Sequence, residues 1–327
     1  MIRLHRKRGG SAPERIGGRT AWHAVLASII LLGGCSGLPT TPGTRTAGVP
    51  IQELTDVPFF PQDAYQCGPA ALAEVLTYSG IVRSPADLIA AVYVPARKGS
   101  LQAEMVAAAR SHGRIVYPLQ TPEEIQAQLR NGLPVLVFQN LGLPQYPRWH
   151  YAVVVGWAPG GEVILRSGTT RRLALDEARF LRTWQWAGGW AQVMLPPDRL
   201  PALAEPGRYL SAAFDLESVG QPVAALGAYQ TAARRWPDQD RAWLAWSNLV
   251  LQEQGSTAAL EALDVIDQGL SHNPNSEVLR LNKAGILLAL GKPAEARGAA
   301  QDIAAREGPW QKQAEDLLHR IEAGEAP

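Results

Sequence analysis

Cysteine is scarce in this sequence, and the motifs of nucleotide and metal enzymes are missing. The chain has 327 residues but only two cysteines, Cys35 and Cys67. It contains no P-loop, no Rossmann glycine fingerprint, no HExxH motif and no CxxC pair. Nucleotide and zinc chemistry therefore have no support, and we expect no cofactor and no metal.

The sequence also lacks a strong net charge. The formal charge is +1, but it hides an asymmetry. Before Cys35 there is one acid, Glu14, and there are six basic residues: Arg3, Arg6, Lys7, Arg8, Arg15 and Arg19. The rest of the chain keeps 25 basic and 29 acidic residues, a net charge of about −4. This mildly acidic body argues against nucleic acid as the main partner.

No apolar run near the N-terminus is long enough to span a bilayer as a mature helix. The run Ala24–Leu32 follows a basic stretch and ends in Leu32-Gly33-Gly34-Cys35, which resembles a bacterial lipobox. Residues 1–35 then form a lipoprotein signal peptide with lipidated Cys35, and residues 36–50 a flexible Pro-, Gly- and Thr-rich tether. Ser36 after the cysteine favours an outer-membrane anchor facing the periplasm. The alternative is an ordinary signal peptide or anchor with a chance cysteine.

The length suits two folded domains. In the first, residues 51–200, helix-like runs come early and strand-like runs late, which predicts an α+β fold with an antiparallel sheet. The strand-like runs are VPFF, RIVYPL, PVLVFQN, HYAVVVGW, EVILRS and WAQVML, and the link APGGE between two of them is typical of a hairpin turn. The run TTRRL is interpreted as a solvated face.

The second domain, residues 206–327, is predicted to be all-α with internal repeats. Ala225, Tyr229, Ala232 and Pro237 follow intervals of four, three and five residues. The same intervals separate a second set: Ala262, Ile266, Gly269 and Pro274. This pattern resembles the tetratricopeptide repeat, whose small residues let antiparallel helices pack closely. A generic helical bundle is the alternative.

Cys67 is predicted to lie at a helix N-terminus. Gly68 and Pro69 follow it, and Pro is favoured in a first helical turn. The helix dipole stabilises a thiolate there, which gives a physical reason to place a nucleophile at this position. If Cys35 is lipidated, Cys67 is the one free thiol in an oxidising compartment. The alternative is a small buried core residue.

A cysteine nucleophile also needs a base and donors for an oxyanion. His150 opens the strand-like run HYAVVVGW and is the preferred base, whereas His112 is interpreted as a helix C-cap. Gln62, five residues before Cys67, is the candidate oxyanion donor together with the Cys67 backbone N–H. Gln66 is a weaker alternative.

The stretches PFFPQDAYQCGPAAL, PVLVFQN and WHYAVVVGW, in this order, resemble the bacteriocin-processing peptidases, which are papain-like cysteine peptidases. The resemblance covers about Val57 to Pro196 and implies that Cys67 is the nucleophile, His150 the general base and acid, and Gln62 the oxyanion donor. Its combination with a lipobox and helical repeats is similar to a group of Gram-negative lipoproteins.

One position departs from that family. An aspartate is usual at the end of the strand after the histidine strand, but here the strand ends with Arg166 and Ser167. Ser167 is the candidate to orient His150, with Asn140 and Asp176 as alternatives. A Cys–His pair can work without an acidic partner, because a thiol ionises more readily than a hydroxyl.

The expected function is therefore a membrane-anchored cysteine peptidase that acts on a peptide or protein, with repeats that recruit a protein partner. One alternative is a weak or inactive peptidase-like scaffold lipoprotein that acts through its helical repeats. Another is a thiol acyl-transfer enzyme on the same fold, such as an amidase or transpeptidase.

Overall fold

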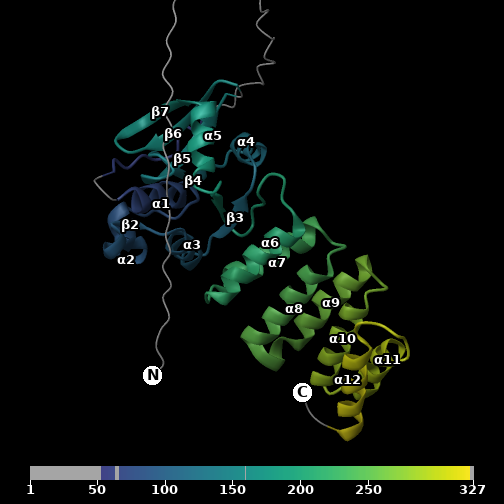
Figure 1. Ribbon diagram of the computed structural model, residues 1–327. Coiled ribbons are helices and arrows are strands. Elements are labelled where there is room, and N and C mark those ends of the chain that lie inside the picture. The colour runs from purple at the N-terminus through teal and green to yellow at the C-terminus, as the bar shows by residue number, and fades with distance from the viewer. Residues whose placement is uncertain (1–52, 63–65, 159, 325–327) are drawn as a thin grey trace, which may run out of the picture. The chain divides into compact units, whose positions relative to one another are not determined.

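The protein is represented by a computed structural model that describes residues 53–62, 66–158 and 160–324. The predicted signal peptide, its Cys35 and the tether lie outside these residues. The predicted fold class is confirmed, because helices and an antiparallel sheet come first and helices alone follow (Figure 1). The change falls between Leu195, where the last strand ends, and Pro206, where the next helix begins.

A six-stranded sheet forms the centre of the first domain, and all its pairings are antiparallel. Its order is β3-β8-β4-β5-β6-β7. The strands are β3 (Ile115–Leu119), β4 (Val135–Asn140), β5 (Trp149–Trp157), β6 (Glu162–Ser167), β7 (Thr170–Asp176) and β8 (Ala191–Leu195). The central strands are almost fully buried, as expected for a sheet covered on both faces.

Helices cover both faces of this sheet (Figure 1). One face packs against α1 (Cys67–Tyr78), α2 (Pro85–Val92) and α3 (Gln102–Ser111), and the other against α4 (Pro122–Arg130) and α5 (Glu177–Gln185). Alternation along β5 explains this division, since Val153 and Val155 join the α1 cluster while Ala152 and Val154 join the other. A short pair, β1 (Tyr93–Val94) and β2 (Gly99–Ser100), flanks the 3₁₀ turn Pro95–Arg97.

One strand prediction differs from the structure, and one strand was not predicted. The run VPFF, residues 57–60, forms no strand, because side chains rather than a neighbouring strand take its backbone groups. Val57 O accepts a hydrogen bond from Arg166, and Phe60 N donates to Glu74. Most of the run TTRRL lies in edge strand β7, which was not predicted, but Arg171 and Arg172 are exposed there, so the interpretation as a solvated face is confirmed.

Arg166 is the largest polar group buried in this domain and lies 1% exposed. Its guanidinium donates to the backbone carbonyls of Leu54, Thr55, Val57 and Arg171 and forms an ion pair with Glu53 at 3.2 Å. Buried charges persist in proteins only when they are paired and hydrogen-bonded in this way. Arg166 therefore fixes the segment 53–57 to β6.

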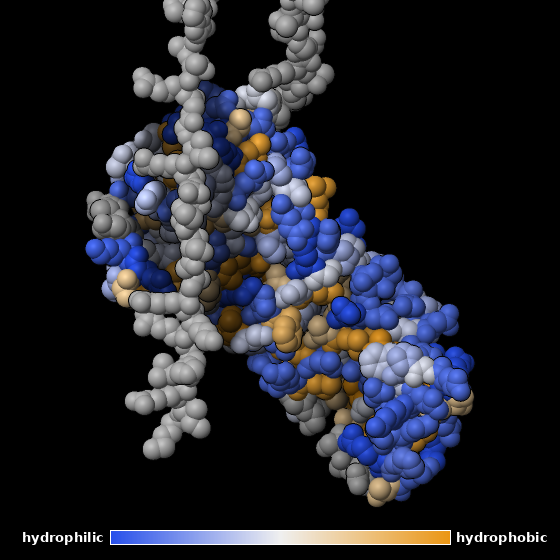
Figure 2. Space-filling view, viewed as in Figure 1, coloured by the Kyte–Doolittle hydropathy of each residue, from blue (hydrophilic) through white to orange (hydrophobic). Residues whose placement is uncertain are grey.

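The C-terminal region consists of helices that pack one after another along the chain. They are α6 (Pro206–Ser218), α7 (Pro222–Arg235), α8 (Asp240–Gln254), α9 (Ala259–His272), α10 (Glu277–Ala289), α11 (Pro293–Ala304) and α12 (Gln311–Ala323), with a 3₁₀ turn at Gly255–Ala258. This arrangement of successive helices fits repeats. On the face shown in Figure 2, hydrophilic residues cover most of α10 to α12.

The small residues of the repeat pattern lie inside this region. Ala225, Ala232 and Ala262 are fully buried, and a side chain at Gly269 would come within 2.7 Å of Trp243. Close helix packing therefore depends on the small residues that the sequence pattern singled out. In the part of the chain that the structure describes, no helix has the length and hydropathy needed to cross a membrane.

Replacement of Arg166 tests the importance of its buried contacts. Arg166→Met should lower the free energy of unfolding by about 3 kcal/mol, because four carbonyls lose this donor in the interior and Glu53 loses one of its two partners. Arg172→Met is the matched control, since Arg172 pairs with the same Glu53 but its side chain is 57% exposed, and it should cost under about 1 kcal/mol. Urea unfolding measures both. Equal losses would contradict the role given to Arg166.

Candidate active site

Cys67 is the first residue of α1, as predicted, and it is a free thiol. The helix is buried from Gly68 to Leu76, so its start is held firmly against the sheet. Gly68 is needed for this contact, because a Cβ at that position would lie 2.2 Å from Ser100 Oγ on β2. The packing of β2 on the helix start therefore fixes where the Cys67 sulfur lies.

The surroundings of Cys67 act on its ionisation in opposite directions. Burial raises the pKa of the thiol above its ordinary value. The backbone N–H groups of Tyr151, Gly68 and Cys67 itself favour the thiolate, but burial outweighs them. Because Tyr151 immediately follows His150, the contact with its N–H also puts Cys67 at the start of β5. The resting sulfur is thus a thiol rather than a preformed thiolate.

His150 is the second residue of β5, and its ring contacts the end of the neighbouring strand β6. Its Nε2 lies 2.8 Å from Ser167 Oγ. Burial and the nearby charge of Arg148 lower the pKa of His150 to about 4. The imidazole is therefore neutral at pH 7, and with Nε2 engaged by Ser167 its Nδ1 remains for another partner.

Gln62 belongs to the loop that leads toward α1. Its backbone N donates to Gly168 O at 3.1 Å, in the turn that follows Ser167. Among the described residues, the two buried polar atoms of its half-buried side chain, Nε2 and Oε1, have no hydrogen-bond partner. Leaving such a group unpaired costs roughly 1–3 kcal/mol, which native proteins tolerate mainly where the group has a task.

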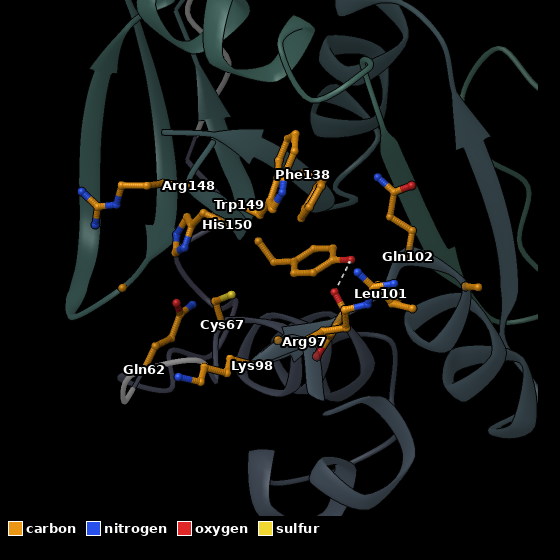
Figure 3. A pocket seen from close by; sticks show the side chains of 15 residues that line it. Gln62, Cys67, Arg97, Lys98, Leu101, Gln102, Phe138, Arg148, Trp149 and His150 are labelled. Atoms are coloured by element: carbon orange, nitrogen blue, oxygen red, sulfur yellow. Dashed lines mark hydrogen bonds between the residues drawn. The ribbon is translucent and has the colours of Figure 1, made fainter. Parts of the chain in front are cut away.

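Cys67, His150 and Gln62 line one cavity of about 1150 Å³. Their side chains gather on the same side of it (Figure 3). Aromatic side chains form a further part of the wall: Phe138 stacks on Trp149 at 5.4 Å between ring centroids and contacts Tyr151 at 4.6 Å. The cavity thus combines a thiol, an imidazole and an unpaired amide with an apolar wall.

The other candidates for orienting His150 have different tasks. Asn140 Oδ1 accepts hydrogen bonds from Gly142 N and Arg148 N, so Asn140 ties down the loop between β4 and β5 and is not the partner of His150. Asp176 caps α5 by accepting from Ala178 N and Arg179 N. Arg166 bonds to the backbone of residues 54, 55, 57 and 171, whereas Ser167 contacts His150, and these contacts decide between the two residues.

Several lining residues were absent from the sequence prediction. Arg97, Lys98 and Ser100 come from the β1–β2 hairpin, which carries no alternating pattern and is too short to predict. Phe138 lies within a predicted strand and Trp149 directly before another, but the sequence does not reveal that they meet. His112 is the C-cap of α3, as predicted, and lies away from the cavity lining. Within the described residues, no group of three His, Cys, Asp or Glu side chains could hold a metal ion.

Comparison with known structures gives similarities for each half of the chain. The peptidase domain of Streptococcus ComA, a bi-functional ABC transporter, is 24% identical (TM-score 0.35) and covers 43% of this chain and 98% of its own. A double glycine motif protease from an AMS/PCAT transporter is 23% identical (TM-score 0.35) and covers 44% and 96%. The Yersinia enterocolitica chaperone SycD is 18% identical (TM-score 0.31) and covers 36% and 83%.

Comparison by sequence adds one family. No curated protein matches the chain significantly. The model of the Peptidase_C39 like family matches residues 54–191, which include Gln62, Cys67, His150 and Ser167. The predicted resemblance to a cysteine peptidase domain is thereby confirmed for residues 54–191, the part of the chain that this family model matches.

Proposed function

We propose that this protein is a cysteine peptidase that hydrolyses a peptide bond through a thioester at Cys67. The observation that supports it most is the contact of 2.8 Å between His150 Nε2 and Ser167 Oγ, at a cavity that both His150 and Cys67 line. A base oriented by a third group beside a nucleophile is the arrangement that acyl transfer requires.

In the proposed reaction, His150 Nδ1 takes the proton of the Cys67 thiol as the sulfur attacks the carbonyl carbon of the substrate. The Gln62 side-chain amide and the Cys67 backbone N–H donate hydrogen bonds to the oxyanion that forms. Collapse of this intermediate breaks the C–N bond, and the imidazolium protonates the departing amine. His150 then deprotonates a water molecule, which attacks the thioester and releases the carboxylic acid and the thiol.

Ser167 takes the position at which an aspartate would stabilise the imidazolium. A hydroxyl orients the ring but supplies no negative charge. With the pKa of His150 near 4 and that of Cys67 raised, the resting pair is neutral. We infer an enzyme that is slow on general peptides and whose site is activated by its own substrate.

The proposal extends to the location and partners of the protein. Lipidation of Cys35 would anchor it to the outer membrane, with the peptidase domain on the periplasmic side. The helices from α6 onward would act as tetratricopeptide-like repeats that recruit the substrate or a protein partner. These parts rest on the lipobox-like sequence and on the repeated small residues.

Variants of the three cavity residues test the chemistry in protein that lacks residues 1–35. A peptidyl chloromethyl ketone should alkylate Cys67, detected by mass spectrometry, and should leave Cys67→Ala unmodified.

His150→Ala should slow hydrolysis of a fluorogenic peptide library at least about 100-fold. Gln62→Ala should lower kcat about 100-fold with little change in KM. The matched control is Gln66→Ala, because Gln66 is the N-cap of α1 without a side-chain cap bond. Equal labelling of wild type and Cys67→Ala would sink the proposal.

Replacement of Ser167 tests the neutral resting pair. In the wild type, alkylation of Cys67 by iodoacetamide should keep rising as pH increases above 8, because the thiol has a raised pKa. Ser167→Asp places a negative charge beside Nε2, which raises the pKa of His150, and the resulting imidazolium lowers that of Cys67. Alkylation at pH 6 should then increase about tenfold, the effect of one pKa unit. Ser167→Asn adds no charge and should behave like the wild type; an equal increase in both variants would count against this explanation.

Replacement of Cys35 tests the anchor in cells that express the full chain. Cys35→Ala should abolish incorporation of radiolabelled palmitate and move the protein from the detergent phase to the aqueous phase in a phase-partition assay. Cys67→Ala is the matched control, because it removes the other cysteine and should leave both readouts unchanged. Lipid incorporation that persists in Cys35→Ala would exclude this anchor.

A further inference from the structure

The cavity around Cys67 is positively charged, although the chain beyond the N-terminal basic stretch is acidic. Three of its lining residues are cations, Arg97, Lys98 and Arg148. Among the described residues that line it there is no aspartate or glutamate. The residues after the basic stretch carry a net charge of about −4, so the positive charge of the cavity lining is opposite in sign to that of the body around it.

The three cations come from two separate segments and face the site from different sides. Arg97 and Lys98 belong to the β1–β2 hairpin and lie across the cavity from Trp149 (Figure 3). Arg148 lies beside His150, on the side away from the aromatic pair (Figure 3). All three are exposed, and Arg97 and Arg148 are accessible to a ligand. In the described part of the chain, neither Arg97 nor Arg148 forms a salt bridge.

The backbone of Arg148 is held rigidly although its side chain is exposed. Arg148 N donates to Asn140 Oδ1 at 2.9 Å, and Arg148 O accepts from Leu141 N at 2.8 Å. The loop between them is tight, since a Cβ at Gly142 would lie 2.3 Å from Tyr146 O. Because this backbone is already fixed, it loses little entropy when the Arg148 side chain binds a ligand, which favours recognition of an anionic group.

We propose that the substrate of this site is a peptide with a glutamate or aspartate close to the bond that is cleaved, and that Arg148, aided by Arg97, recognises its carboxylate. This inference rests on the proposed peptidase function and names its substrate class. An arginine offers a fork of N–H donors that matches a carboxylate with two parallel hydrogen bonds.

The position of Arg148 links this recognition to catalysis. Its positive charge is, after burial, the second cause of the lowered pKa of His150, so it disfavours the imidazolium that the reaction forms. A substrate carboxylate bound to Arg148 offsets that charge. An acidic substrate thereby supplies part of the stabilisation that Ser167, a neutral residue, does not give. Binding of the acidic residue should therefore raise kcat as well as lower KM.

Two fluorogenic peptide libraries test the proposal on protein lacking residues 1–35. They are identical except that one carries Glu where the other carries Gln, at each position in turn. At one or two positions near the cleaved bond, the wild type should show a kcat/KM at least about tenfold higher for Glu, with part of the gain in kcat. Salt at about 0.5 M should reduce the preference, because the charges lie on the exposed rim.

Arginine variants supply the controls. Arg148→Gln should bring the Glu/Gln ratio close to one, and Arg97→Gln should reduce it severalfold. Arg130→Gln is the matched control, because Arg130 is an exposed arginine of the same domain that does not line the cavity, and it should keep the full ratio. Equal turnover of Glu and Gln peptides by the wild type would overturn the proposal, and so would an unchanged ratio in Arg148→Gln.

The failure of this proposal can be told apart from failure of the peptidase function. Labelling of Cys67 by a small neutral chloroacetamide reports the nucleophile without any acidic residue. If that labelling depends on His150 while Glu and Gln peptides are cut equally, only the substrate class is wrong. If no peptide is cut, the fluorescence anisotropy of the same libraries measures their binding to the Cys67→Ala variant. Tighter binding of the Glu peptides supports the proposal, and equal or weaker binding of the Glu peptides overturns it.

Discussion

The site depends on the packing of the α1 N-terminus against the start of β5. Helix α1 is buried along nine consecutive residues, so it cannot turn or slide without opening the core. Gly68 lets Ser100 come close to its first turn, and the Tyr151 N–H meets the Cys67 sulfur. Since Tyr151 follows His150 directly, this single contact brings the thiol and the imidazole into one cavity.

The electrostatics of the site favour neutral groups. Burial raises the pKa of Cys67 and lowers that of His150, and the residue next to the ring is a serine. A site built this way protects its thiol from alkylation and oxidation, because the thiolate is the reactive form. The same neutrality means that charge separation must be stabilised by what binds. The cations of the cavity and the neutral Cys–His pair therefore complement each other. In the proposed reaction, an acidic substrate binds to the cations and supplies the negative charge that the pair lacks.

The sequence predicted the order of the cavity residues but not how the cavity is walled. Cys67, His150 and Gln62 stand beside local signals, namely a Gly-Pro helix start, an apolar strand and a loop before the helix. Strand β7 and the β1–β2 hairpin lack such signals, because charges or shortness mask their periodicity. The sequence could not decide whether Arg166 or Ser167 contacts His150, because that depends on how β6 packs against segments far away along the chain. Asn140 was misjudged as a possible orienter because its polar side chain serves a loop that only the fold defines.

Two buried ionisable residues of the core, Arg166 and Glu74, hold the segment that leads to Gln62. Arg166 holds the carbonyls of residues 54, 55 and 57, and Glu74 accepts the Phe60 N–H at 3.1 Å, so both grip the segment that ends at Gln62. Burial raises the pKa of Glu74 to about 8 against the opposing effects of Phe60 and Arg166. At pH 7 Glu74 is therefore mostly a neutral acceptor, while Glu53 is the charged partner of Arg166. The side chains of Arg166 and Glu74 thus hold in place the backbone that leads to Gln62.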